Sequence, residues 1–220
     1  MVLDWAFVCG LLSVIAIDLV LAGDNAVVIA MAVKALPKQQ RRKGIVLGVG
    51  AAVAMRVVLT FFVAQLLQIV FLKLVGGVLI AWIAVKLFVD GVPDGAENKG
   101  VGSISQAIRF IVIADLSMSL DNMLAVGGAS GGNLFLLIFG LGVSIPLVVF
   151  TSSLITRLMD KYPAIIYIGA AILGRVAGEM IFTDPFVANW FTPGPFLLYS
   201  IEAAFALGVI LAGKLLIKKH

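Results

Sequence analysis

The sequence predicts an all-α membrane protein with seven transmembrane helices, arranged as a 3+3 inverted-topology repeat plus a seventh helix. Three observations support this fold class. The chain of 220 residues is 62% hydrophobic and only 13% charged, whereas soluble domains are typically about 25% charged. Its apolar residues fall into long runs separated by short polar linkers. A polar motif in the first run also returns in the fourth run, 97 residues later.

Each apolar run can cross a bilayer as a helix, because a hydrocarbon core of about 30 Å needs about 20 residues. A β-barrel is disfavoured, since the runs lack the short alternating pattern of barrel strands. The seven predicted spans cover residues 5–33, 45–68, 71–89, 105–129, 134–156, 162–183 and 196–216. We therefore expect a single transmembrane domain over residues 1–220.

The linker charges predict the orientation of these spans. Residues 34–43 carry five positive charges, and positive residues gather in cytoplasmic loops. Further basic residues fall on the same side of the membrane: Lys99, Arg109, Arg157, Lys161, Lys218 and Lys219. We expect a multi-pass protein of the plasma membrane with its N-terminus outside and its C-terminus in the cytoplasm. The net charge of +4 is then a topology signal, and no nucleic-acid partner is expected.

The repeated motif divides the chain into two halves and one extra helix. Residues 1–90 form the first three-helix repeat, residues 104–184 form the second, and residues 195–217 form the extra helix. Because each half contains an odd number of spans, the second half enters the membrane inverted. Inverted repeats are typical of secondary transporters, whose binding site lies near the midplane where the halves meet.

The motif itself is the candidate site. A carboxylate in the bilayer centre costs roughly 2.5–3.5 kcal/mol on insertion scales, so four of them in a repeated spacing indicate a function. Under inversion, Asp18 should lie level with Asp121, and Asp24 level with Asp115. The residues of the two copies are Asp18, Asp24 and Asn25 in the first run, and Asp115, Asp121 and Asn122 in the fourth.

Helix geometry adds a condition to this site. Asp18 and Asn25 are seven residues apart and share a helix face, whereas Asp24 lies about 100° away from that face. Both aspartates of one copy can approach the same point only if the helix is distorted between them. Gly23 could provide such a break in the first copy, and Ser117 and Ser119 could bend the second.

Carboxylate and carboxamide oxygens favour hard divalent cations such as Mg²⁺, Ca²⁺ or Mn²⁺. Sodium ions and protons are further candidates for the ion that these oxygens bind. A zinc or copper site of the usual kind is excluded, because Cys9 and His220 are the chain's only cysteine and histidine. The structural alternative is that protonated aspartates and asparagines join two helices through hydrogen bonds.

Other charged residues within the spans are possible supports of the site. Arg56, near the middle of the second span, should pair with one of the aspartates, either as a counter-charge for the site or as a purely structural ion pair. Glu202 should either line an outer vestibule or lie exposed at the interface. Arg175 and Glu179 are four residues apart and predict an ordinary helix-surface pair, with a functional role as the alternative. Ser119 is a further supporting candidate.

The two Asp-x5-Asp-Asn segments, together with Ala177-Gly-Glu-Met180, resemble the TerC family of integral membrane proteins, especially its short bacterial YjbE-type branch. The resemblance covers essentially the whole chain. It implies Mn²⁺ efflux, with the aspartates and asparagines of the two motifs as metal-site residues. The wider superfamily also includes lysine exporters.

We expect a secondary transporter that exports a divalent cation, most plausibly Mn²⁺, with exchange for protons left open. The metal ion is then a substrate, the bilayer is the other partner, no cofactor is needed, and a homo-oligomer remains open. No enzymatic activity is expected, and the chain contains no P-loop motif for ATP hydrolysis. The alternatives are an exporter of amino acids or other small molecules and, more remotely, an intramembrane aspartyl protease that uses Asp24 and Asp121.

Overall fold

The computed structural model describes residues 9–15, 23–60, 62, 71–92, 102–130 and 133–218. Within these ranges the protein is helical and contains no strand, which confirms the predicted all-α class. Residues 9–15 are helical. The helices that follow are α2 (Gly23–Lys34), α3 (Lys38–Thr60), α5 (Leu72–Gly91), α6 (Ile104–Met118), α7 (Leu120–Ala129), α8 (Leu134–Lys161), α9 (Ala164–Phe182), α10 (Pro185–Trp190) and α11 (Pro195–Ile217).

Five helices among the described residues are long and apolar enough to cross a membrane, namely α3, α5, α8, α9 and α11. They correspond to the second, third, fifth, sixth and seventh predicted spans. The first and fourth predicted spans, which carry the repeated motif, differ. The first is described only as residues 9–15 and α2, and the fourth is divided into α6 and α7. The total of seven transmembrane helices therefore stays a prediction.

Polar side chains fix the beginnings of several helices. Ser103 accepts a hydrogen bond from the Gln106 amide at 3.1 Å and caps α6. Asn133 accepts one from the Leu136 amide at 3.2 Å and caps α8. These oxygens satisfy amides that have no partner inside the helix. The buried carboxylate of Asp184 caps α10 through the Phe186 amide and also accepts from the Leu74 amide of α5 at 3.0 Å. It therefore joins the ends of helices that are far apart in sequence.

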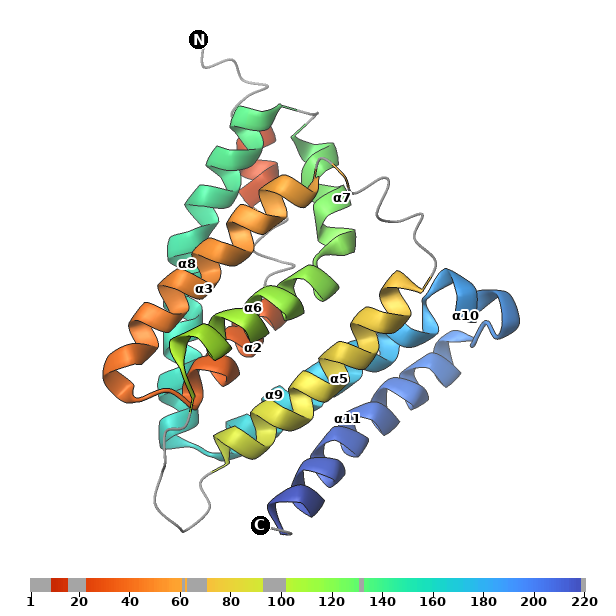
Figure 1. Ribbon diagram of the computed structural model, residues 1–220. Helices are drawn as coiled ribbons and strands as arrows, with labels where there is room; N and C mark the ends of the chain where they lie inside the picture. The colour runs from red at the N-terminus through yellow and green to blue at the C-terminus, as the bar shows by residue number, and fades with distance from the viewer. Residues whose placement is uncertain are drawn as a thin grey trace.

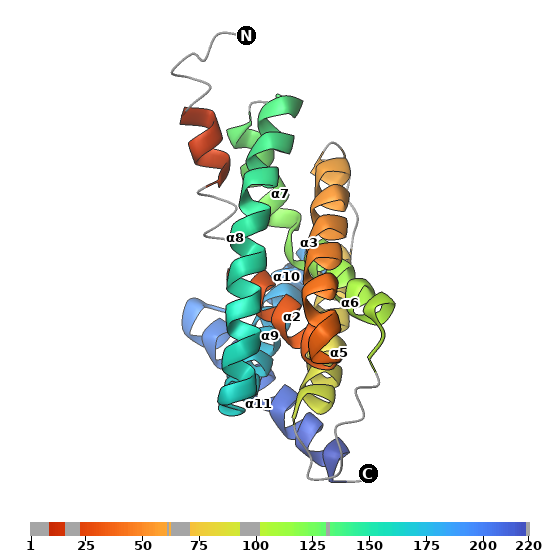
Figure 2. The ribbon, with the colours of Figure 1, turned by 90° about the vertical axis from the view of Figure 1, so that its left-hand side faces the viewer.

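The helices form two packed groups (Figure 1). Helices α5, α9 and α11 lie side by side, and α2, α3, α6 and α8 form the second group. In Figure 2, α3 and α8 appear as two long columns with α2 between them. The first half of the chain interleaves with the second, because α2 packs on α8, α3 packs on α6, and α5 packs on α9.

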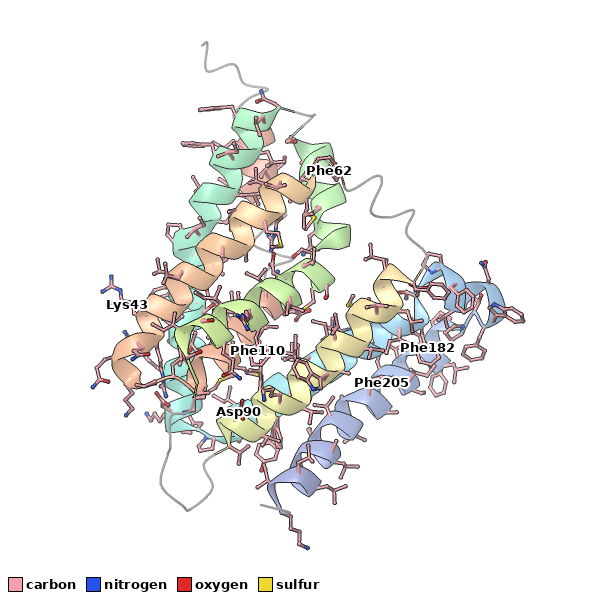
Figure 3. The ribbon with its side chains drawn as sticks, in the orientation of Figure 1. Lys43, Phe62, Asp90, Phe110, Phe182 and Phe205 are labelled. Atoms are coloured by element: carbon pink, nitrogen blue, oxygen red, sulfur yellow. The ribbon has the colours of Figure 1, made fainter. Side chains whose placement is uncertain are left out.

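Small residues allow close approach within the group of α5, α9 and α11. A Cβ atom placed on Gly174 of α9 would lie 2.8 Å from the Ala206 Cα of α11, so the two backbones are almost in contact. Close backbone approach at glycine is a common way for membrane helices to gain van der Waals packing. In the same group of helices, the rings of Phe182 and Phe205 pack edge to face, with 6.3 Å between their centroids (Figure 3).

The outer faces of the long helices suit a lipid environment. Large apolar side chains remain exposed on α8 and α11, for example Phe150 and Phe196. The inward faces of these long helices contribute to a core that joins residues of α2, α3, α5, α6, α8, α9 and α11. Exposed apolar surface of this extent would be unfavourable in water but is compatible with hydrocarbon.

A salt-bridge cluster ties the loop between α2 and α3 to the end of α8. The carboxylate of Asp160 pairs with Lys34, and it lies 2.6 Å from a guanidinium nitrogen of Arg41. Arg41 also donates to the carbonyl oxygens of Lys34 and Leu36, each at 3.0 Å. The basic linker of the first half is therefore anchored on the second half of the chain.

Candidate ion-binding site

The second copy of the motif lies where one helix ends and another begins. Helix α6 stops at Met118, Ser119 has φ −94° and ψ 2°, and α7 starts at Leu120 in a different direction (Figure 1). The Ser119 amide still donates to the Asp115 carbonyl at 2.8 Å. Two residues earlier, the Ser117 hydroxyl donates to the Ile113 carbonyl at 2.9 Å, a bond that favours bending of a helix. The expected distortion between the two aspartates is present in this copy.

Asp115 is buried at the end of α6 and forms an ion pair with Arg56 of α3. The Arg56 nitrogen that forms this ion pair is Nη2, and it also donates a hydrogen bond to the Ser119 hydroxyl at 3.0 Å. Only 5% of the Arg56 side chain and 9% of the Asp115 side chain are exposed. The sequence predicts an aspartate partner for Arg56, and among the described residues the first aspartate of the second motif is such a partner.

Asn25 of α2 reaches the same place from the first half of the chain. It lines a small cavity of about 20 Å³ together with Arg56, Asp115 and Ser144. The apolar remainder of the wall consists of Ile29, Val49, Ala52, Val53, Ile145 and Val148. A space of about 10–15 Å³ already holds one water molecule, so the cavity matches a single small ion. The Asn25 Nδ2 atom is buried and finds no hydrogen-bond partner within the part of the chain that the structure describes.

A buried amide nitrogen that finds no partner among the described residues is unusual, because most buried polar atoms are hydrogen-bonded. The two ends of a carboxamide exchange by a half-turn of the side chain, so Asn25 can present either a donor or an acceptor to the cavity. With its oxygen turned inward, the cavity would offer carboxamide, carboxylate and hydroxyl oxygens. These are ligands that hard cations prefer.

Asp24 faces another group of charges. Its carboxylate lies 4.0 Å from the Arg175 guanidinium of α9, which also lies 3.8 Å from Glu179 and 3.5 Å from Glu202 of α11. Three carboxylates thus surround one guanidinium. Glu202 is buried, with 6% of its side chain exposed, whereas 44% of the Asp24 side chain is exposed. The expectation of simple interfacial exposure for Glu202 is wrong, because the side chain is turned toward Arg175.

Parts of the predicted site lie outside the described residues. These parts are Asp18 and the side chain of Asp121, so their approach to the site stays a prediction, whereas Asp24 lies in the separate cluster around Arg175. Asn122 is buried in the first turn of α7. Among the described residues, no three His, Cys, Asp or Glu side chains are grouped so that they could hold a metal ion.

Two contributors were not identified from the sequence. Arg175 was interpreted as the partner of Glu179 alone, and its contacts with α2 and α11 depend on tertiary packing. Ser144 was overlooked, although a serine two residues before Pro146 in an apolar run was a usable signal. Proline lacks an amide hydrogen and disturbs the hydrogen bonds of a helix interior, and Pro146 lies inside α8 directly after Ile145, which lines the cavity.

Comparison with known proteins gives a family and several relatives. Residues 3–220 match the profile of the family described as integral membrane protein TerC family. The chain is 45% identical over 178 residues to the "Uncharacterized membrane protein YjbE" of Bacillus subtilis (strain 168), covering 81% of each chain. It is 26% identical over 209 residues to "Uncharacterized membrane protein YceF" of the same strain, covering 90% of this chain and 79% of that relative.

A more distant relative is the "UPF0053 inner membrane protein YoaE" of Escherichia coli (strain K12). It is 23% identical over 196 residues, which cover 80% of this chain but only 37% of that protein. No solved structure matches the chain significantly.

Proposed function

Since the chain belongs to the TerC family of integral membrane proteins, we propose that it is a secondary transporter that exports the divalent metal cation Mn²⁺. The observation that carries this proposal is the cavity between the two motifs, where Asn25 of the first copy meets Asp115 of the second. Two distant segments that share one sequence pattern supply polar groups to one space of ionic size. Transport, rather than catalysis, is the proposed activity.

The proposed inverted repeat is supported by the way in which the halves interleave. At the 97-residue offset, exchanging the halves would replace α2 by α7, α3 by α8 and α5 by α9. The packing of α2 on α8 then corresponds to the packing of α7 on α3, and both pairs are present. The break at Ser119 also supports the proposal, since transporters commonly form their ion sites at interrupted helices.

The choice of metal follows from the ligand atoms. The cavity is lined by carboxylate, carboxamide and hydroxyl groups, and Cys9, the chain's one cysteine, is exposed on the helix of residues 9–15. Oxygen ligands accept Mn²⁺ without the preference for Zn²⁺ or Cu²⁺ that thiolates and imidazoles create. Mg²⁺ would be disfavoured because it gives up water reluctantly and demands near-ideal octahedral geometry.

The proposed direction is from the cytoplasm outward, with the basic linker 34–43 on the cytoplasmic side, the N-terminus outside and the C-terminus inside. Protons are the proposed exchange ion, because carboxylates that release a metal need another positive charge.

A second candidate function is export of an amino acid or another small organic molecule. An apolar cavity of about 770 Å³ between α3, α5 and α6 favours it, and Leu116 and Ser117, the residues after Asp115, contribute to the wall. The remaining lining residues are apolar: Ala51, Ala54, Met55, Val58, Leu59, Leu72, Val75, Gly76 and Leu79. The wall offers no charged group for an ammonium or a carboxylate, so the smaller polar cavity remains the better candidate for the substrate.

Purified protein in liposomes tests the two functions. We expect ⁵⁴Mn²⁺ to move across the membrane when a metal or proton gradient is imposed, and we expect the Asp115→Ala variant to abolish that movement. Flux of an amino acid, with no Mn²⁺ flux under any imposed gradient, would replace the metal proposal with the second candidate. In cells, loss of the protein should raise internal Mn²⁺ and sensitivity to it.

A further inference from the structure

We propose that Arg56 is a tethered counter-cation: it neutralises Asp115 when no metal is bound and must leave that carboxylate when a metal ion binds there. This inference rests on the proposed function, because it assigns a role within the same transport cycle.

The first step of the argument is competition for one carboxylate. Arg56 pairs directly with an oxygen of Asp115 and forms part of the wall of the cavity that Asp115 and Asn25 line. A cation that enters the cavity therefore meets a guanidinium on the ligand that it needs. A guanidinium and a divalent ion repel each other strongly at contact distance in a poorly solvated site. Binding of the metal to Asp115 consequently requires Arg56 to withdraw.

The second step is that withdrawal must be a movement. An arginine side chain keeps its charge under physiological conditions, so it cannot give way by losing a proton. The structure provides an acceptor for the displaced group, because the nitrogen that binds Asp115 also donates to the Ser119 hydroxyl at 3.0 Å. Ser119 forms the break between α6 and α7. The guanidinium therefore bridges the ligand and the break in the helix.

The third step concerns the empty transporter. After the metal has left, an unneutralised Asp115 would be a buried charge, which is unfavourable within a membrane. Arg56 restores neutrality by returning to the carboxylate. It therefore assists the steps in which the empty site reorients, and it is not needed while the metal itself neutralises the site.

Because Arg56 assists the empty site and not the metal-loaded site, its replacement should affect two kinds of flux differently. Net efflux requires the empty site to reorient, whereas exchange of ⁵⁴Mn²⁺ for unlabelled Mn²⁺ uses the metal-loaded site alone. In liposomes, Arg56→Gln should lower net efflux at least about tenfold, which corresponds to about 1.4 kcal/mol. Exchange should stay close to that of the wild type. The Mn²⁺ concentration for half-maximal exchange should fall, since the competing cation is gone.

Arg56→Lys and Ser119→Ala are the matched variants. Lysine keeps the charge but loses the fork geometry, so Arg56→Lys should retain most of the net efflux. Ser119→Ala removes the second acceptor but leaves the ion pair, so it should reduce exchange more than Arg56→Gln does. If Arg56→Gln does not fold, Arg56→Lys decides between the two roles: its modest loss should fall on net efflux and not on exchange, whereas a structural pair would lower both fluxes equally.

Several results would overturn the inference. A parallel loss of net efflux and exchange in Arg56→Gln, or in Arg56→Lys if the glutamine variant does not fold, would show that the pair is structural. Undiminished net efflux in Arg56→Gln would show that no counter-cation is required. These results leave the proposed function intact as long as the wild type transports Mn²⁺. Absence of both fluxes in the wild type would remove the proposed function, and this inference with it.

Discussion

Asp24 and Asn25 are consecutive residues of α2, yet their side chains belong to different polar clusters. Asn25 is buried and lines the cavity with Arg56 and Asp115. The carboxylate of Asp24 faces Arg175, 4.0 Å away on α9. Neighbours on a helix point about 100° apart, so one motif contributes to two clusters on different sides of α2. The predictions below test the role of each cluster.

Replacement of Asp24 by alanine should abolish Mn²⁺ transport while the protein remains in the membrane. Arg175 would retain Glu179 and Glu202 as partners, so the loss of one carboxylate does not leave its charge uncompensated. Liposome flux and membrane yield measure the two effects. Glu179→Gln is the matched control, because Glu179 contacts the same arginine at a similar exposure, and this variant should keep most of the transport. Equal transport in Asp24→Ala and the wild type would disprove a role in transport.

Asp115→Asn should lower thermal stability as well as transport. The substitution removes the Asp115 carboxylate from its buried ion pair with Arg56, and removal of one partner from a buried ion pair costs about 3–5 kcal/mol. The apparent melting temperature in detergent should fall clearly. The double variant Arg56→Gln with Asp115→Asn should recover part of this loss, because neither charge remains. Additive losses in the double variant would show that the two side chains do not interact energetically.

Gly174→Ala should destabilise the contact between α9 and α11. The new methyl group would lie 2.8 Å from the Ala206 Cα and 2.8 Å from the Phe205 carbonyl oxygen, and the backbone of α11 would have to move away. Overpacking of this kind typically costs about 1–3 kcal/mol. Gly208→Ala is the control on α11, since nothing lies within 4 Å of its added Cβ. A melting temperature that falls equally in both variants would contradict the proposed close packing.

The orientation can be tested with cysteine labelling in a Cys9→Ala background. Lys43 is exposed at the beginning of α3 (Figure 3), and Thr192 is exposed between α10 and α11. An impermeant maleimide added to intact cells should label Thr192→Cys but should reach Lys43→Cys only after the membrane is opened. The positive charges around residue 43 are the physical reason, because such loops remain in the cytoplasm. The reverse pattern would invert the proposed topology.

The sequence by itself determined the class of the protein, the positions of its long helices and the candidate ligands. These properties depend on residues that lie close together in the sequence. A run of about 20 apolar residues must hide its backbone polar groups in a helix when it lies in hydrocarbon, and α5, α8, α9 and α11 match their predicted spans closely. The need of Arg56 for a partner was also evident from the sequence, since a lone charge in a span is unfavourable.

The tertiary structure decided which partner each charge receives. Asp115 lies 59 residues from Arg56 in the chain, and Arg175 and Glu202 lie 27 residues apart. Spacing along one helix cannot reveal a contact between helices, so the grouping of Asp24 with Arg175 was missed. The position of the helix break was also undetermined, because both Ser117 and Ser119 were candidates. Only the packing of α6 and α7 against α3 selects Ser119, where the broken helix meets Arg56.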